Sequence, residues 1–161
     1  LPPRRYVTDG PDHFDDEPHA YLFSYAREYE PVRYLRLDPP RQPTRETLDR
    51  VRAFIAAGLP IVFGVTVFDS IDDDPEIPFP ARADRALGGQ ALVALGYDDD
   101  RGTRSGRGAL HVRSSWGTGW GDDGYGWLPY THVKRGLAAD FWTFLRPDWI
   151  ASGEFSSMIA K

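Results

Sequence analysis

The apolar positions between residues 44 and 58 follow the spacing of an amphipathic helix. Leu48, Val51 and Ile55 recur at intervals of three and four residues, which places them on one helical face. Thr44 precedes them as a suitable N-cap, and Gly58 stands where the end of a helix favours left-handed backbone. The pattern therefore predicts a helix over residues 44–58 with one buried face.

A shorter helix is predicted nearer the start of the chain. Asp16 or Glu17, directly before Pro18, is suited to begin it, because proline is tolerated in a first helical turn. Helical spacing continues over residues 20–28, and Pro31 marks the end of the pattern.

The remaining apolar stretches predict strands and hence an α+β fold. Residues 32–37 alternate between apolar and polar, and residues 59–68 form a nearly continuous β-branched run typical of a strand buried on both faces. Further antiparallel strands, separated by Gly and Asp turns, are expected over residues 90–97, 109–114, 124–129 and 141–145. Because the strands mostly follow the helices, the order predicts a small barrel-like or strongly twisted sheet with the helices to one side.

Composition limits the classes of partner. The chain has 161 residues, 41% of them hydrophobic, which is enough for one domain with a single core. A net charge of -5, with the acidic residues spread along the chain, argues against a nucleic-acid partner. No apolar run approaches the roughly 20 residues of a membrane span, so no membrane partner is expected, and the compartment stays unknown. The start at Leu1, rather than Met, leads us to expect a processed or incomplete N-terminus.

Cysteine is absent, which removes disulfides, thiolate metal sites and thiol nucleophiles from this polypeptide. His13, His19 and His132, the last expected in a loop, have no Cys, Asp or His nearby at ligand spacing. His111 lies three positions before Ser114, so strand alternation puts the two on opposite faces and a structural role is expected for the histidine. We therefore expect neither a metal nor a cofactor.

The other candidate chemistry is weak. Ser70, Ser114 and Ser115 carry hydroxyls, but none stands in a nucleophile-elbow motif. The acidic runs at residues 72–74 and 98–100 lack the alternating spacing of a calcium loop, so solvated turns are expected. The long acidic and proline-rich segment over residues 69–87 is of the kind that frames a cleft.

Three stretches resemble the C-terminal half of papain-family cysteine peptidases (clan CA, family C1): GGQALVALGYDDD, VRSSWGTGWGDDGYGWLPY and AADFWTF. Upstream, FDDEPHAYLFSYAREYEPVRYLRLD and AAGLPIVFGVTVFDS are similar to the bacterial branch of the family. The resemblance implies a papain-like fold, mostly the β-barrel-like right lobe with flanking helices and an incomplete left lobe. In one domain, residues 1–30 would be a left-lobe or connecting remnant, residues 31–146 the right lobe, and residues 147–161 a tail.

The sequence departs from the family at the catalytic positions. Where the family reads Gly-Gly-His-Ala, Gln90 replaces the catalytic histidine, and Ser114 replaces the asparagine that orients it. The nucleophilic cysteine belongs to an N-terminal stretch that this sequence does not contain. A primary amide does not titrate near neutral pH, so Gln90 offers neither a general base nor a general acid. Losing such a group typically removes 10²–10⁴-fold of rate, about 3–5 kcal/mol of barrier.

These departures predict a catalytically inactive pseudopeptidase that binds a peptide or a protein. The ligand cleft would lie over residues 63–67 and be formed by Gly88, Gly89, Gln90, Ala91, Ser114 and Trp116. In the resemblance Trp116 shields the His–Asn pair, a packing role that can outlast the chemistry. One alternative is the C-terminal piece of a processed or two-chain hydrolase or transferase, with the nucleophile on a second fragment. Another is a scaffold that only completes a partner's fold.

Overall fold

The structure is a computed structural model that describes residues 17–27, 33–38 and 45–145. The chain divides into two compact units, Leu1–Val32 and Arg33–Lys161. The described part of the first unit contains one helix, α1 (Ala20–Arg27), none of whose residues is buried. The helix begins at Ala20 rather than at residue 16 or 17, and the expected stretch from Glu28 to Pro31 lies outside the described residues.

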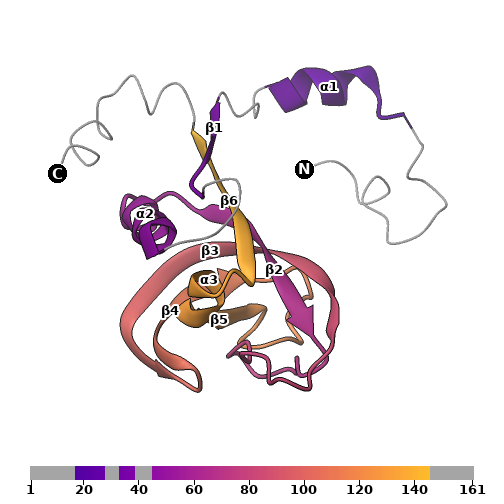
Figure 1. Cartoon of the computed structure of the whole chain (residues 1–161). Coiled ribbons are helices and arrows are strands. Elements are labelled where there is room, and N and C mark those ends of the chain that lie inside the picture. The colour runs from indigo at the N-terminus through magenta and orange to yellow at the C-terminus, as the bar shows by residue number, and fades with distance from the viewer. Residues whose placement is uncertain (1–16, 28–32, 39–44, 146–161) are drawn as a thin grey trace. The chain divides into compact units, whose positions relative to one another are not determined.

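The second unit is built on one six-stranded sheet in the order β1-β6-β2-β3-β4-β5, with antiparallel pairing between all neighbours (Figure 1). The strands are β1 (Arg33–Arg36), β2 (Ile61–Phe68), β3 (Ala86–Thr103), β4 (Gly106–Arg113), β5 (Tyr125–Pro129) and β6 (Ala138–Leu145). The mixture of helices and an antiparallel sheet is the predicted α+β class. β3 curves strongly, as Figure 1 shows, but the sheet stays open between β1 and β5, so it does not close into a barrel.

The helix α2 (Arg45–Ala56) confirms the predicted amphipathic pattern. Leu48, Val51 and Ile55 are buried and belong to the core cluster. Gly58 follows with a φ of 82°, the left-handed backbone expected after a helix. Thr44, the predicted N-cap, lies outside the described residues.

β2 is less buried than its sequence suggests. Ile61, Phe63 and Val65 are buried in the core, while Val62 and Thr66, on the opposite face, are half-buried. The prediction of a strand buried on both faces is therefore wrong. In an antiparallel sheet one face commonly packs on the core and the other remains partly solvated, even where the strand is apolar throughout.

β3 is the longest strand and differs most from its predicted bounds of residues 90–97. Its first half pairs with β2 through Gly88 and Gly89, although glycine is a poor strand residue. Its second half runs through Asp98–Asp100, which were expected to form a solvated turn, and the ladder with β4 shifts register between Asp98 and Gly102. Pairing with both neighbours therefore decides the length of β3.

Residues 130–134 form a short helix, α3 (Tyr130–Lys134), that the sequence pattern did not predict. His132 lies in this helix and is 1% exposed, so its expected place in a loop is wrong. β6 also begins three residues before the predicted residue 141. β6 pairs with both β1 and β2, and His132 of α3 lies 3.2 Å from the carbonyl of Pro78, so partners distant in the sequence hold both elements.

The segment 69–85 is held against the sheet rather than lying free. Glu76 forms a parallel bridge with Trp127 at the edge of β5. The amide of Ile77 donates to the carbonyl of Trp127 at 2.9 Å, and that of Trp127 donates to Pro75 O at 2.6 Å. This pairing covers part of the β5 edge and fixes the loop that the next section describes. None of the described helices has the length and hydropathy of a membrane span.

Candidate functional site

The first half of β3 has a sheet partner on one side only. Residues 86–94 pair with β2, with Gln90 opposite Val65, whereas pairing with β4 starts at Val93. Among the described residues, residues 86–92 therefore leave one edge open, and Gly88, Gly89 and Ala91 are exposed along it. An open strand edge offers backbone N–H and C=O groups to an added strand.

The side chain of Gln90 bridges β3 to the segment that follows β4. Its Nε2 donates to Ser115 Oγ at 3.1 Å and to the carbonyl of Ala91 at 3.3 Å. No described residue contacts its Oε1 at hydrogen-bond distance, so the acceptor half of the amide is open. The amide is thus held in place, with one face available to a ligand.

Ser114 has no hydrogen bond to Gln90 in the described structure. Its hydroxyl accepts a hydrogen bond from the amide of Trp116 at 3.2 Å, and its own amide donates to Gly124 O at 3.0 Å. The hydroxyl is therefore satisfied within its own turn, as serine side chains commonly are. The neighbouring Ser115, rather than Ser114, is the partner of Gln90.

Trp116 is 41% exposed, although a tryptophan usually loses most of its surface on folding. Its ring packs edge-to-face against Trp120, with ring centroids 5.3 Å apart. Trp120 is buried and donates from Nε1 to the carbonyl of Asp72 at 3.1 Å, which ties the loop 69–85 to this corner. The exposed indole of Trp116 thus packs on a buried ring that is itself fixed by a hydrogen bond.

A small hollow lies between these elements, with room for about one water molecule (10 Å³). Its polar lining comes from Thr66, Ser70 and Gln90, and Ser70 Oγ is buried without a hydrogen-bond partner. The rest of the lining is apolar: Val65, Val67, Phe68, Ile71, Ile77, Pro78, Leu92 and Trp116. None of the lining side chains in this described region titrates near neutral pH.

The structure brings together some of the residues that were predicted to form a cleft. Gln90, Trp116 and residues 65–67 line the hollow, while Phe63 is buried in the core beneath it. Gly88, Gly89 and Ala91 lie on the open edge of β3 next to the hollow, and Ser114 adjoins it without lining it. The sequence analysis considered Ser70 only as a candidate hydroxyl and assigned no residue of the loop 69–85 to the cleft, although the length and proline content of that loop pointed to one.

The described histidines in the sheet unit lie outside the hollow. The ring of His132 has Nδ1 3.2 Å from Pro129 O and Nε2 3.2 Å from Pro78 O, and burial lowers its pKa below the ordinary value. His111 contacts the rings of Tyr125 and Trp127, with centroid distances of 5.5 Å and 4.7 Å. Within the described ranges, no three His, Asp or Glu side chains are grouped closely enough to hold a metal ion.

Comparisons with known proteins point to one family. An uncharacterized peptidase C1-like protein of Acanthamoeba polyphaga mimivirus is 30% identical over 136 residues, which are 80% of this chain and 42% of that protein. The crystal structure of xylellain, a cysteine protease from Xylella fastidiosa, is 31% identical, with a TM-score of 0.64 over 81% of this chain and 46% of that chain. A clostridial cysteine protease after propeptide cleavage shares the fold, with a TM-score of 0.50 at 17% identity over 70% of this chain and 28% of that chain. No protein-family model matches the sequence.

The chain spans less than half the length of these relatives. This partial coverage fits a C-terminal portion of a papain-like enzyme, in agreement with the position of the three motifs. The chain is therefore similar to the papain-like, C1-type cysteine peptidases in sequence and in fold.

Proposed function

We propose that this chain is a non-catalytic lobe of papain type that binds an extended peptide segment. The observation that carries the proposal is Gln90, whose amide bonds to Ser115 at the position where the resemblance places a histidine. General acid–base catalysis needs a group that gains and loses a proton near neutral pH, and no side chain lining this hollow does so. The residues of this hollow therefore support binding of a peptide rather than its cleavage.

The open edge of β3 supplies the binding mode. An extended peptide would add as a strand along residues 86–92, where main-chain hydrogen bonds give affinity without demanding a particular side chain. The exposed ring of Trp116 would cover one ligand side chain, and Gln90 Oε1 would accept a hydrogen bond from a ligand N–H. The small volume of the hollow limits the side chain beneath Trp116 to a small one.

Peptide titrations followed by NMR test the binding mode. We expect the amide shifts of residues 86–92 to move with an unmodified extended peptide and to stay unchanged with its backbone N-methylated copy, which cannot pair as a strand. Leu87→Ala, which removes a 63%-exposed side chain on the open edge, should weaken binding several-fold. Leu95→Ala, the matched change on the part of β3 paired with β4, should not. Peptide shifts centred elsewhere would contradict the proposal, and no shift with any peptide would favour the scaffold function.

Hydrolysis assays on the longest natural form of the protein test the absence of catalysis. We expect no thiol-dependent cleavage of peptide esters above the buffer rate, because Gln90 cannot deprotonate a thiol or protonate a leaving group. Thiol-dependent turnover that survives in a Gln90→Ala variant would show that another residue supplies the base. Turnover lost in that variant would show that Gln90 itself takes part in catalysis. Either result would overturn the proposal.

A second candidate function follows from the coverage of the relatives. Because the chain matches 42% and 46% of two of them, it is comparable to one part of a two-part hydrolase or transferase whose nucleophile lies elsewhere. Mass spectrometry of native material would detect a copurifying fragment. A fragment that carries a reactive cysteine would favour this function over simple peptide binding.

A further inference from the structure

A second, larger hollow lies between the β3–β4 turn and the end of α3. It has a volume of about 360 Å³ and is lined by Pro78, Phe79, Arg104, Ser105, Thr131 and Arg135. Only Pro78 is shared with the Gln90 hollow. Its size falls within the range of small-molecule sites, roughly 300–1,000 Å³.

Arg104 is held in place before any ligand arrives. Its guanidinium lies 2.6 Å from Asp74 Oδ2, and its backbone amide donates to Glu76 Oε1 at 2.8 Å. The pKa of Asp74 is lowered, chiefly by the hydrogen bond from the amide of Glu76, so this carboxylate stays ionised and keeps its arginine. A guanidinium has five N–H donors, and this one ion pair leaves some of them for a ligand.

Arg135, which also lines the hollow, has no acidic partner among the described residues. It follows the last turn of α3 and is exposed, as is Arg104. Asp74 is ion-paired with the guanidinium of Arg104, whereas Glu76 accepts a hydrogen bond from the neutral backbone amide of Arg104, so Arg135 is the lining guanidinium without an ion pair in the described chain. An anion that enters the hollow would therefore meet one oriented guanidinium and one free guanidinium.

The remaining lining combines hydroxyl groups with an apolar wall. Thr131 Oγ1 donates to the carbonyl of Ser105 at 3.0 Å, and the buried hydroxyl of Ser105 has no partner. Phe79 packs edge-to-face on His132 with ring centroids 5.3 Å apart, which fixes its orientation beside Pro78. The lining of the hollow thus combines two guanidinium groups with apolar side chains.

We propose that this hollow binds a small organic carboxylate, with the carboxylate between Arg104 and Arg135 and an apolar body against Pro78 and Phe79. The planar guanidinium fork matches the geometry of a carboxylate, and a flat apolar body fits beside an aromatic ring. The site is separate from the open edge of β3 and does not depend on the peptide-binding proposal.

Titrations with benzoate, benzamide, acetate and inorganic phosphate at low salt test the ligand class. We expect benzoate to bind and to shift the amides of Phe79, Ser105 and Thr131. Benzamide has the same ring without the charge and acetate has the charge without the ring, so both should bind at least 10-fold more weakly. Binding of phosphate as tight as that of benzoate would overturn the assignment to a carboxylate with an apolar body. Equal binding of benzamide would overturn the role of the arginines.

Variants at exposed arginines test the location. Arg135→Gln should weaken benzoate binding at least 10-fold, since it removes a charged hydrogen-bond donor from the site, and should leave the fold intact. Arg82→Gln is the matched control, because Arg82 is exposed, has no acidic partner in the described chain, and lies outside the hollow. Equal loss in both variants would mean nonspecific charge attraction, and unchanged affinity in Arg135→Gln would place the ligand elsewhere.

Discussion

The ring of Tyr130 leaves no room for a side chain at Gly108 of β4. A Cβ built on Gly108 would lie 2.3 Å from Tyr130 Cε2, and Gly108 has a φ of 90°, which side-chain-bearing residues rarely adopt. The Tyr130 hydroxyl donates to Asp99 Oδ1 at 2.8 Å, and burial raises the pKa of the phenol, so the ring keeps both its proton and its place. The ring therefore has little freedom to yield to a new methyl group.

Gly108→Ala should consequently destabilise the fold by about 3 kcal/mol, from about 1–2 kcal/mol of backbone strain and a similar overpacking cost. Chemical denaturation of the two proteins measures this difference. Gly58→Ala is the control, because Gly58 shares the positive φ but has open space where the Cβ would stand, so its loss should be about 1 kcal/mol. Equal losses in the two variants would show that the contact with Tyr130 has no cost.

The site residues that sequence reasoning found are those whose signal is local. Gln90 and Trp116 stand in short motifs, and both line the same hollow in the structure. Ser70 and Ile77 also line it, but their position depends on the bridge between Glu76 and Trp127, about 50 residues apart in the chain. Pairing over that distance leaves no periodic trace in a single sequence.

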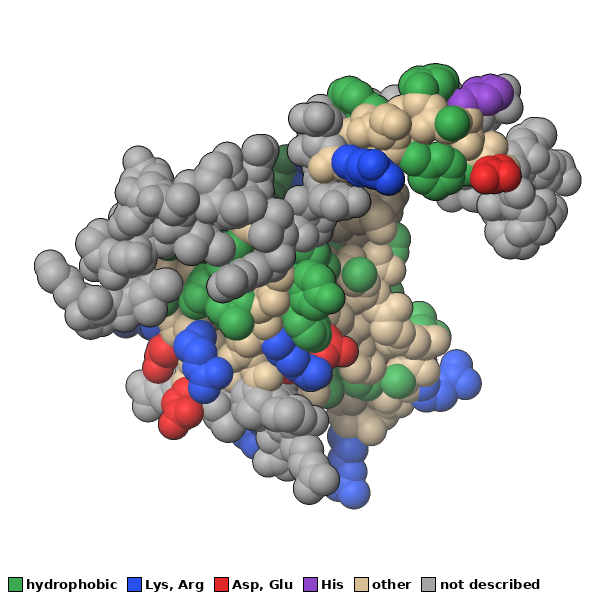
Figure 2. Space-filling view, turned by 90° about the horizontal axis from the view of Figure 1, so that it is seen from above, with side chains coloured by type: hydrophobic (Ala, Val, Ile, Leu, Met, Phe, Trp, Pro, Cys, Tyr) green, Lys and Arg blue, Asp and Glu red, His purple; other side chains and the backbone are tan. Residues whose placement is uncertain are grey.

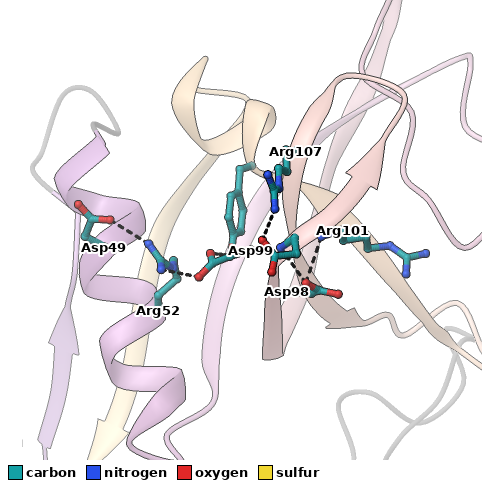
Figure 3. Close-up of polar contacts among 8 residues, drawn as sticks. Asp49, Arg52, Asp98, Asp99, Arg101 and Arg107 are labelled. Atoms are coloured by element: carbon teal, nitrogen blue, oxygen red, sulfur yellow. Dashed lines mark hydrogen bonds and ion pairs between the residues drawn. The ribbon is translucent and has the colours of Figure 1, made fainter.

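At the scale of elements, charged side chains join α2, β3 and β4 (Figure 3). Arg52 of α2 lies 2.6 Å from Asp99 Oδ2 of β3 and 3.2 Å from Asp49 Oδ1 of its own helix. Asp98 Oδ1 accepts hydrogen bonds from the amides of Asp100 and Arg101, and Arg107 pairs with Asp100, so the register shift of β3 is held by its own aspartates. The run that looked like a solvated turn is thus a fixed part of the strand.

The coupling between α2 and β3 through this ion pair should nevertheless be small. The side chains of Arg52 and Asp99 are 32% and 44% exposed, and pairs at that exposure typically contribute 0.2–1 kcal/mol. A double-mutant cycle with Arg52→Met and Asp99→Asn should give a coupling below about 1 kcal/mol that decreases further in high salt. A coupling of about 3 kcal/mol, insensitive to salt, would mean that the pair behaves as a buried one.

Helices and strands were predicted correctly where the spacing of apolar residues within the element itself was sufficient. The buried face of α2 follows from its own spacing, as the burial of Leu48, Val51 and Ile55 confirms. The ends of β3 and the presence of α3 could not be predicted in the same way, because they depend on partners that fold back from elsewhere: β2 for Gly88 and Gly89, and Pro78 for His132. Local propensity opposed the strand at the glycines, and the sheet overrode it.

At the scale of the whole molecule, the charges of the described residues are mixed rather than gathered by sign. On the face shown in Figure 2, Lys and Arg side chains lie interspersed with Asp and Glu. Several oppositely charged side chains of the described chain are paired, as in Arg36–Asp38, Arg85–Asp69 and Arg104–Asp74. Global stability near neutral pH should therefore respond more to a buried titratable group than to the surface charge as a whole.

His132 is that group, and it gives the described domain a predicted acid sensitivity. Burial lowers the pKa of the imidazole, and this effect outweighs the carbonyls of Pro129 and Pro78, which favour the protonated ring, and the more distant charge of Glu76. Because the folded pKa lies below the unfolded value of about 6.5, the unfolded chain binds more protons below that pH. The free energy of unfolding should be fully present above about pH 6.5 and should fall as the pH falls toward the folded pKa. Denaturation curves from pH 8 to pH 5 measure this slope, and His132→Gln should flatten it, although the variant starts from a lower stability. Constant or rising stability of the wild type over this range would mean that the buried ring takes up its proton without cost and that the two carbonyls, rather than burial, govern its charge.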